Sequence, residues 1–266
     1  MPENRLMRFI SKTSLDGVTE QLFTLGEVPG VLWTPEDADG ARPLILMGHG
    51  GGQHKQARGI VARARRFAAE CGFAAAAVDA PGHGDRPRTA EHDRMITEIR
   101  ARIQARENVT PLLASFHALL AAQSVPEWRA VLDAVQQLDH VGAGPAGYLG
   151  LSLGCALGVP FIAAEARIRA AVLGLNGAET SAEAAAQITV PVQFLVQWDD
   201  ALVPRAASLA LFDTFGSAEK TLHANPGGHG DVPMFEVDSA QRFFTRHLGS
   251  TPAGHRVLPR KHPVPG

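Results

Sequence analysis

Cysteine is nearly absent from this chain, and its scarcity excludes several classes of protein. Only Cys71 and Cys155 occur among 266 residues, so a framework of disulfides and a CxxC metal or redox site are both excluded. No apolar run reaches the roughly 18 residues of a membrane-spanning helix. The opening MPENRLMRFISK also lacks the apolar run of a signal peptide. We therefore expect a cytoplasmic protein with free thiols.

A marked excess of charge of either sign is also missing. Lys plus Arg number 25 and Asp plus Glu number 27, which gives a formal net charge of −2. Neither nucleic acid nor a membrane is expected as a partner, because binding to both relies on a strongly positive surface. Hydrophobic residues make up 45% of the chain and charged residues 20%, which is typical of a globular protein with a substantial core.

Short apolar runs alternate with amphipathic segments along most of the chain. The runs that are typical of strands buried on both faces are 44–47, 73–78, 148–151, 170–175 and 192–196. The segments that are typical of helices are 57–70, 127–138, 206–215 and 236–247, and residues 19–25 and 30–34 suggest an antiparallel entry to the sheet. This alternation predicts an α/β fold, with a mostly parallel, doubly wound sheet in a single domain over residues 1–249. The Pro-rich, basic segment 250–266 is expected to be a loose tail.

One connection is longer than a crossover between parallel strands requires. Two stretches in it have helical patterns, 91–106 and 112–123, and Pro111 separates them because proline cannot supply a helix hydrogen bond. We expect residues 88–125 to be an inserted helical hairpin that acts as a cap; the alternative is a pair of ordinary packing helices. Pro126 is expected in the first turn of the following helix, where proline is well tolerated.

The most specific motif is the GxSxG sequence Gly150-Leu151-Ser152-Leu153-Gly154. It follows an apolar strand and precedes a small-residue segment that can form a helix. In this context the serine occupies a strained turn that exposes its hydroxyl, and the glycines let helix and strand approach closely. The motif therefore predicts that Ser152 is a nucleophile; the alternative is an ordinary serine in a glycine-rich turn.

A serine nucleophile requires a general base, and the base requires an orienting carboxylate. Asp199 and Asp200 directly follow the strand run that ends at residue 196, where a sheet delivers catalytic groups. His229 lies among glycines in a loop before the last helix, whereas His223 has the pattern of a strand residue and His255 lies in the tail. We predict that His229 is the base, with Asp200 or Asp199 as its partner.

A glycine-rich loop, Gly48-His49-Gly50-Gly51-Gly52, follows the first parallel strand. Acyl transfer generates a tetrahedral oxyanion, and glycines allow backbone N–H groups to approach it closely. We predict that the N–H groups of Gly51 and Leu153 form this oxyanion hole. Phosphate binding is the alternative, but neither a GxGxxG nor a Walker GK[ST] sequence is present.

These motifs together resemble the α/β-hydrolase superfamily, and its dienelactone-hydrolase-like and small carboxylesterase branches in particular. The resemblance runs from about residue 44 to 248 and includes a DxPGHG-like turn at 79–84 and a DxxVP loop at 200–204. In the family the carboxylate stands immediately before xxVP, which implies Asp200 rather than Asp199. The family also implies a structural role for His49, whose side chain would hydrogen-bond the oxyanion loop.

The sequence departs from common family patterns in three places. Gln197 stands where many members have glycine, and Cys155 stands where a second glycine is frequent. The usual cap position holds only a short link at 176–188, which implies that any lid comes from residues 88–125.

The function implied is a serine hydrolase that cleaves a carboxylic ester of a small or medium acyl substrate through an acyl-enzyme on Ser152, His229 and Asp200. No cofactor is expected, and no metal, because the sequence has no HExxH, HxH or Cys/His cluster. Thioesterase, lactonase or acyltransferase activity on the same triad stays open, as does cofactor-free lyase or perhydrolase chemistry. A non-catalytic binding protein with this fold is the alternative from another class. The expected partner is a small-molecule acyl ester or thioester, and the sequence does not determine the oligomeric state.

Overall fold

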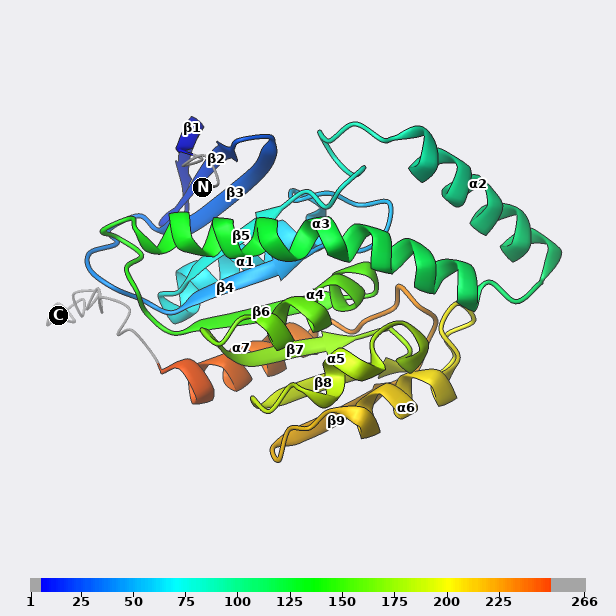
Figure 1. Ribbon diagram of the computed structural model, residues 1–266. Coiled ribbons are helices and arrows are strands. Elements are labelled where there is room, and N and C mark those ends of the chain that lie inside the picture. Colours follow the sequence, from blue (N-terminus) through cyan, green and yellow to red (C-terminus); the bar gives the residue numbers. More distant parts are fainter. Residues whose placement is uncertain (1–5, 250–266) are drawn as a thin grey trace, which may run out of the picture.

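A nine-stranded sheet forms the centre of the part of the chain that this computed structural model describes, residues 6–249 (Figure 1). The strand order is β1-β2-β3-β5-β4-β6-β7-β8-β9. The strands are β1 (Met7–Leu15), β2 (Val18–Leu25), β3 (Val28–Pro35), β4 (Leu44–Gly48), β5 (Ala74–Val78), β6 (Ala146–Leu151), β7 (Ile168–Gly174), β8 (Val192–Gln197) and β9 (Lys220–Asn225). Strands β1 to β3 and the β3–β5 pair are antiparallel, and all later neighbours are parallel.

Helices cover both faces of this sheet. The helices are α1 (Arg58–Cys71), α2 (Ala90–Ala105), α3 (Thr110–Gln136), α4 (Leu153–Ala164), α5 (Ala182–Ala186), α6 (Arg205–Thr214) and α7 (Phe235–Leu248), with a 3-10 turn η1 (Ala178–Thr180). Helices α1 and α7 pack on one face, and α3, α4, α5 and α6 on the other (Figure 1). No helix among residues 6–249 combines the length and the apolar character needed to cross a membrane.

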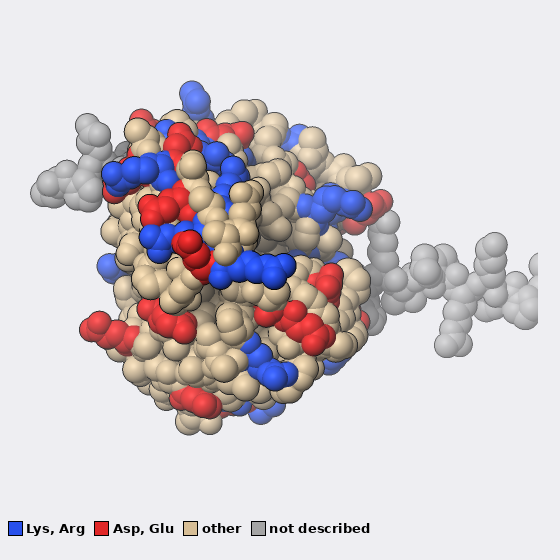
Figure 2. Space-filling view, turned by 90° about the vertical axis from the view of Figure 1, so that its right-hand side faces the viewer, with Lys and Arg blue, Asp and Glu red and all other residues tan. Residues whose placement is uncertain are grey.

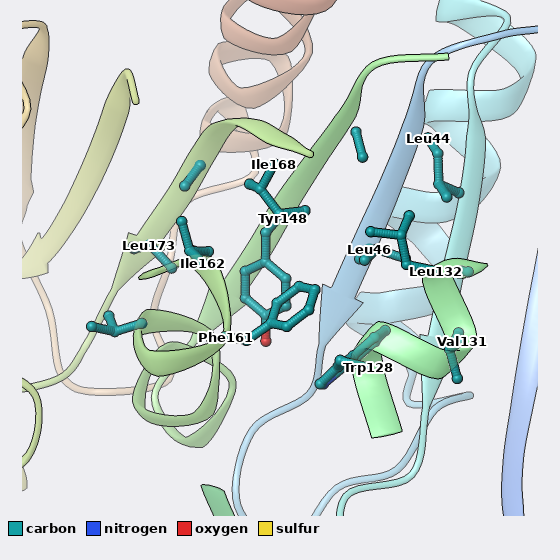
Figure 3. Close-up of a cluster of buried hydrophobic side chains, with 14 of the residues drawn as sticks. Leu44, Leu46, Trp128, Val131, Leu132, Tyr148, Phe161, Ile162, Ile168 and Leu173 are labelled. Atoms are coloured by element: carbon teal, nitrogen blue, oxygen red, sulfur yellow. The ribbon is translucent and has the colours of Figure 1, made fainter. Parts of the chain in front are cut away.

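Successive side chains of each strand point to opposite faces of the sheet, so the hydrophobic core is divided into two clusters. In β4, Leu44 and Leu46 join the cluster beneath α3 and α4, whereas Ile45 and Met47 join the cluster beneath α1 and α7. The first cluster centres on the rings of Trp128, Tyr148 and Phe161, whose centroids lie 5.8–6.0 Å apart (Figure 3). This packing fixes α4, and therefore the turn that precedes it, against the carboxyl end of β6.

The expected architecture is confirmed: the five parallel strands and the antiparallel entry form at the predicted segments. The alanine run of β5 favours helix by propensity, yet it is buried as a strand between β3 and β4. Strand β1 was not anticipated, because it is exposed along almost its whole length and shows no apolar alternation. The tail expected at 250–266 lies outside the described residues.

The prediction that a separate helix begins near residue 127 is wrong. Helix α3 is continuous from Thr110 to Gln136 and contains Pro126 in its interior, so Pro126 does not begin a helix. Proline removes one helix hydrogen bond, but Leu120 and Trp128 on either side are buried and hold the helix in place. Pro111 does lie in the first turn of α3, after the break that separates it from α2.

Candidate active site

Ser152 occupies a strained turn between β6 and α4. Its backbone has φ 57° and ψ −119°, a region that residues other than glycine rarely adopt. Its N–H donates to the carbonyl oxygen of Gly174 at 3.0 Å, which ties the turn to the neighbouring strand β7. A Cβ at Gly154 would lie 2.4 Å from the carbonyl oxygen of Gly48, so only glycine fits there. The GxSxG sequence therefore forms the strand–turn–helix that it predicted.

Tyr148 stabilises this turn through its hydroxyl and its ring. Its hydroxyl donates to the carbonyl oxygen of Gly154 at 2.8 Å. The hydroxyl occupies space that a side chain at position 48 would need, and the ring occupies space that a side chain at position 158 would need. Burial raises the pKa of Tyr148 well above its usual range, so the hydroxyl remains a donor. Sequence reasoning missed this role, although Tyr148 is the only tyrosine of the chain and lies four residues before the serine.

Ser152, His229 and Asp200 lie in one chain of hydrogen bonds. The Ser152 Oγ is 2.8 Å from Nε2 of His229, and Nδ1 of His229 is 2.6 Å from Oδ2 of Asp200. The other oxygen of Asp200 accepts from the N–H groups of Leu202 and Val203 at 2.8 and 2.9 Å. The Asp200 side chain is 2% exposed and that of His229 is 25% exposed, so the imidazole bridges a buried carboxylate and an accessible hydroxyl.

Asp199, the alternative carboxylate, does not contact His229. Its Oδ2 accepts from the N–H of Gly227 at 3.1 Å, while the side chain that reaches the imidazole is that of Asp200. His223 is not part of this hydrogen-bond chain. Its Nδ1 lies 2.8 Å from Oε2 of Glu236 instead. The structure therefore brings together the serine, the histidine and the carboxylate that the family pattern implied.

Gly51 and Leu153, the expected oxyanion pair, lie beside each other. A Cβ built on Gly51 would be 4.0 Å from the Cβ of Leu153. Leu153 is the first residue of α4, where backbone N–H groups have no partner within the helix. The positive end of the helix dipole adds to the attraction for negative charge at this point.

His49 fastens the glycine loop to the end of β5. Its Nε2 accepts from the N–H of Ala80 at 3.0 Å, and its Nδ1 donates to the carbonyl oxygen of Gly50 at 2.9 Å. Burial is the main cause that lowers the pKa of His49 to about 4. The ring is therefore neutral at pH 7 and acts as a donor on one side and an acceptor on the other.

A buried ion pair holds the next part of the same loop. Lys55 donates from Nζ to Asp79 at 2.8 Å and to Asp85 at 2.6 Å, and its backbone N–H donates to Asp79 at 2.7 Å. Burial opposes the charge on Lys55, but the bonds to both carboxylates outweigh it and raise its pKa. Next to it, Arg86 forms a two-bond ion pair with Glu127 of α3, both at 2.7 Å. These contacts connect the segment that follows the glycine loop 48–52, the turn after β5 and α3.

The hairpin of α2 and α3 packs on the first turns of α4. Ile99 of α2 and Phe116 and Leu120 of α3 form a small apolar cluster with Leu153 and Leu157. Leu153 directly follows Ser152, so this cluster reaches the site itself. Figure 2 looks onto the end of the molecule where α2 lies, and there basic and acidic side chains are intermingled. Neither sign of charge forms a continuous patch on this face.

Cys155 is unsuited to act as a second nucleophile. The side chain is fully buried, and burial raises the pKa of its thiol to about 12, so the reactive thiolate does not form near neutral pH. Among residues 6–249, no three His, Cys, Asp or Glu side chains are grouped in a way that could hold a metal ion.

The sheet order, the strained serine turn and the hydrogen-bonded Ser152–His229–Asp200 chain define one fold family. The chain belongs to the α/β-hydrolase superfamily, as the motifs predicted. It is similar over 90% of its length to a cold-adapted esterase from an Arctic intertidal metagenomic library, with 32% identity, a TM-score of 0.73 and 97% of that chain covered.

More distant structures share the fold. An acetyl xylan esterase from Paenibacillus sp. R4 is 14% identical with a TM-score of 0.64, covering 91% of this chain and 88% of the other. A dienelactone hydrolase from Anabaena variabilis is 17% identical with a TM-score of 0.59, covering 91% of this chain and 99% of the other. No protein-family profile and no curated protein sequence matches the chain.

Proposed function

We propose that this chain is a serine hydrolase that cleaves carboxylic esters of small or medium acyl compounds. The observation that supports this most is the hydrogen-bond chain from Ser152 through His229 to Asp200, at 2.8 and 2.6 Å. A nucleophile, its base and the carboxylate that orients the base are the parts that acyl transfer requires. The similarity to an esterase at 32% identity supports an ester as the bond cleaved.

The reaction proceeds in two acyl-transfer steps. Ser152 Oγ attacks the ester carbonyl carbon while Nε2 of His229 takes the hydroxyl proton, and Asp200 stabilises the imidazolium. The tetrahedral intermediate collapses, the alkoxide leaves with the proton from His229, and an acyl-serine remains. Water then attacks the acyl-serine with His229 as base, which releases the carboxylic acid and restores the serine.

The backbone N–H groups of Gly51 and Leu153 are proposed to stabilise the oxyanion of each tetrahedral intermediate. Their proximity supports this role, as does the position of Leu153 at the start of α4. His49 holds the loop of Gly51 in place through its bonds to Gly50 and Ala80. Because these donors are fixed before the substrate binds, no reorganisation is needed during the reaction.

We also propose that residues 88–125 form a cap that contributes to substrate selection. The apolar cluster that Phe116 and Leu120 share with Leu153 supports this, because it brings α2 and α3 next to the nucleophile. The partly buried side chains packed around this cluster, among them Met95, Ile96 and Leu113, are apolar as well, and such surroundings favour an uncharged acyl chain over an acid or a sugar phosphate. The expected partner is therefore a small neutral ester, without a cofactor.

The experiment that tests the proposal is a substrate panel on the purified chain. It contains p-nitrophenyl esters with acyl chains of two to twelve carbons, thioesters of the same acyl groups, and lactones. Hydrolysis of the oxygen esters with a preference for short or medium chains is expected, with no turnover by Ser152→Ala. Preferential turnover of thioesters or lactones would replace the ester assignment, and a parent protein that turns over none of them would favour a binding role.

A further inference from the structure

The two loops that carry Asp200 and His229 are joined by hydrogen bonds that do not involve the triad itself. Beyond the end of β8, the N–H of Trp198 donates to the carbonyl oxygen of Asn225 at 2.7 Å. The N–H of Asp199 donates to the carbonyl oxygen of Gly227 at 3.1 Å, and the N–H of Gly227 donates back to Oδ2 of Asp199 at 3.1 Å. The segment after β8 is therefore bonded both to the end of β9 and to the loop that carries His229.

The side chain of Gln197, the last residue of β8, adds a second connection. It is buried, and its Nε2 donates to the carbonyl oxygens of Pro226 and Gly228, each at 3.3 Å. Its Oε1 has no hydrogen-bond partner among the described residues, so the amide bonds only to this loop. Gly228 directly precedes His229, which places the connection one residue from the imidazole.

The histidine loop needs such support because its own backbone is permissive. Gly227, Gly228 and Gly230 surround His229, and Gly227 has φ +103°. Glycine populates many backbone conformations, so a loop rich in it loses more entropy when one conformation is fixed. General-base catalysis requires the imidazole within hydrogen-bond reach of the hydroxyl, and a displacement of about 1 Å can lower the rate by about 100-fold.

We propose that Gln197 and Asp199 are positioning residues that hold the histidine loop, and so His229, in line with Ser152. This inference rests on the proposed function, since it assigns two residues that act through the triad. Gln197 acts as a donor to two carbonyl groups, and Asp199 acts as an acceptor for one N–H. The amide at position 197 thus gives a reason for the departure from the glycine that many related chains have there.

The proposed role of Asp199 as a hydrogen-bond acceptor predicts which substitutions it tolerates. The amide oxygen of asparagine accepts a hydrogen bond as a carboxylate does, so Asp199→Asn keeps the contact with Gly227, and Asp199→Ala removes it. We expect Asp199→Asn to retain kcat within about twofold of the parent and Asp199→Ala to lose about tenfold. A residue that supplied negative charge to the imidazole would lose activity in both variants.

Gln197→Met tests the other contact, because methionine has a similar length and no donor. Gln193→Met is the matched control: Gln193 lies four residues earlier on the same face of β8, is also buried, and its Nε2 has no partner among the described residues. We expect Gln197→Met to lower kcat for a p-nitrophenyl ester by about 10- to 100-fold, with KM within about twofold and a melting temperature close to that of Gln193→Met. A loss confined to kcat is the signature of misplaced catalytic groups.

Labelling of the parent by a fluorophosphonate separates failure of this inference from failure of the proposed function. A parent that is labelled, with Gln197→Met as active as Gln193→Met, overturns the role of Gln197. Equal losses in Asp199→Asn and Asp199→Ala overturn the role of Asp199. Both variants change an exposed side chain, so this comparison tests how the histidine loop is held even if Gln197→Met does not fold. A parent that is neither labelled nor active overturns the proposed function and the positioning roles with it.

Discussion

At the scale of single residues, two aspartates next to each other in sequence have different chemical surroundings. Asp200 is buried and accepts from two backbone N–H groups as well as from His229, whereas Asp199 is exposed and accepts from Gly227. A carboxylate held in this way orients the imidazole and stabilises its positive charge during the reaction.

Asp200→Asn is expected to lower kcat by about 10³- to 10⁴-fold, because an amide can present the wrong hydrogen-bonding atom to Nδ1 and stabilises the imidazolium less. Asp199→Asn is the control and should stay close to the parent. Steady-state kinetics on one p-nitrophenyl ester measures both. An Asp200→Asn variant with most of its activity would remove Asp200 from the catalytic assignment.

His49 predicts a specific dependence of stability on pH. Its pKa lies at about 4 in the folded state against 6.5 for an ordinary histidine, so the unfolded chain binds the additional proton between these values. The stabilisation from a neutral His49 is therefore complete above pH 6.5 and is lost as the pH falls toward 4. From the size of the shift, the loss is about 3 kcal/mol.

Urea unfolding at a series of pH values from 7 to 4 measures this effect. The free energy of unfolding should fall more steeply with acid in the parent than in His49→Gln, which has no group to titrate there. His54→Gln, at an exposed position in the same loop, should follow the parent. Identical slopes in the parent and in His49→Gln would show that His49 is not buried as a neutral ring.

At the scale of elements, an apolar cluster and the ion pair between Arg86 and Glu127 help to hold the hairpin of α2 and α3 in place. Arg86 and Glu127 are mostly buried and joined by two bonds of 2.7 Å, so the loss of one partner leaves a charge in a site of poor solvation. The pair connects α3 to the turn after β5, which also holds His49 and Lys55 through Ala80 and Asp79.

Glu127→Ala is expected to lower the free energy of unfolding by about 3 kcal/mol, because Arg86 then lacks its carboxylate. Glu98→Ala is the control: it removes an ion pair with Arg102 of the same 2.7 Å length on the exposed side of α2, and should cost less than about 1 kcal/mol. Urea titration measures both. Equal losses in the two variants would mean that burial does not distinguish these pairs.

The elements that sequence could predict are those with a strong local pattern. The central strands are continuous apolar runs, and the serine turn, the acid loop and the histidine loop each follow a strand in a recognisable order. Helix α3 was divided wrongly at Pro126, because its continuity depends on packing of Leu120 and Trp128 against α4 and the sheet. Strand β1 has neither apolar alternation nor burial, so no local signal marked it.

The supporting contacts of the site could not be predicted for a related reason. Gln197 bonds to Gly228, 31 residues away, and Lys55 bonds to Asp79, 24 residues away. Such pairs are fixed by the relative position of strands in the sheet and have no fixed spacing in sequence. Tyr148 is similar: its bond to Gly154 becomes evident only when the turn between β6 and α4 has its shape.

At the scale of the whole molecule, the two apolar clusters share the same strands. Residues of β4 alternate between the cluster under α3 and α4 and the cluster under α1 and α7, so neither face can lose its packing without exposing the sheet. We propose on this basis that residues 1–249 fold as a single domain that includes the cap at 88–125.

Trp128→Ala and Phe67→Ala, one in each cluster, test this proposal. Each is expected to lower the free energy of unfolding by about 3–5 kcal/mol, because a large buried ring leaves a cavity. In a single domain, each variant unfolds in one transition at a lower denaturant concentration than the parent. Far-ultraviolet circular dichroism and tryptophan fluorescence both follow this transition. For Phe67→Ala, which keeps every tryptophan, the transitions measured by the two probes should coincide. Two separated transitions would contradict a single domain.

The central claim is that Ser152 is an activated nucleophile, and covalent labelling tests it most directly. Intact-protein mass is measured after treatment with a fluorophosphonate, on the parent and on Ser152→Ala. The account predicts one adduct on the parent and none on the variant, because only a serine deprotonated by His229 reacts at a useful rate. Equal labelling of both proteins, or no adduct on the parent, would contradict it.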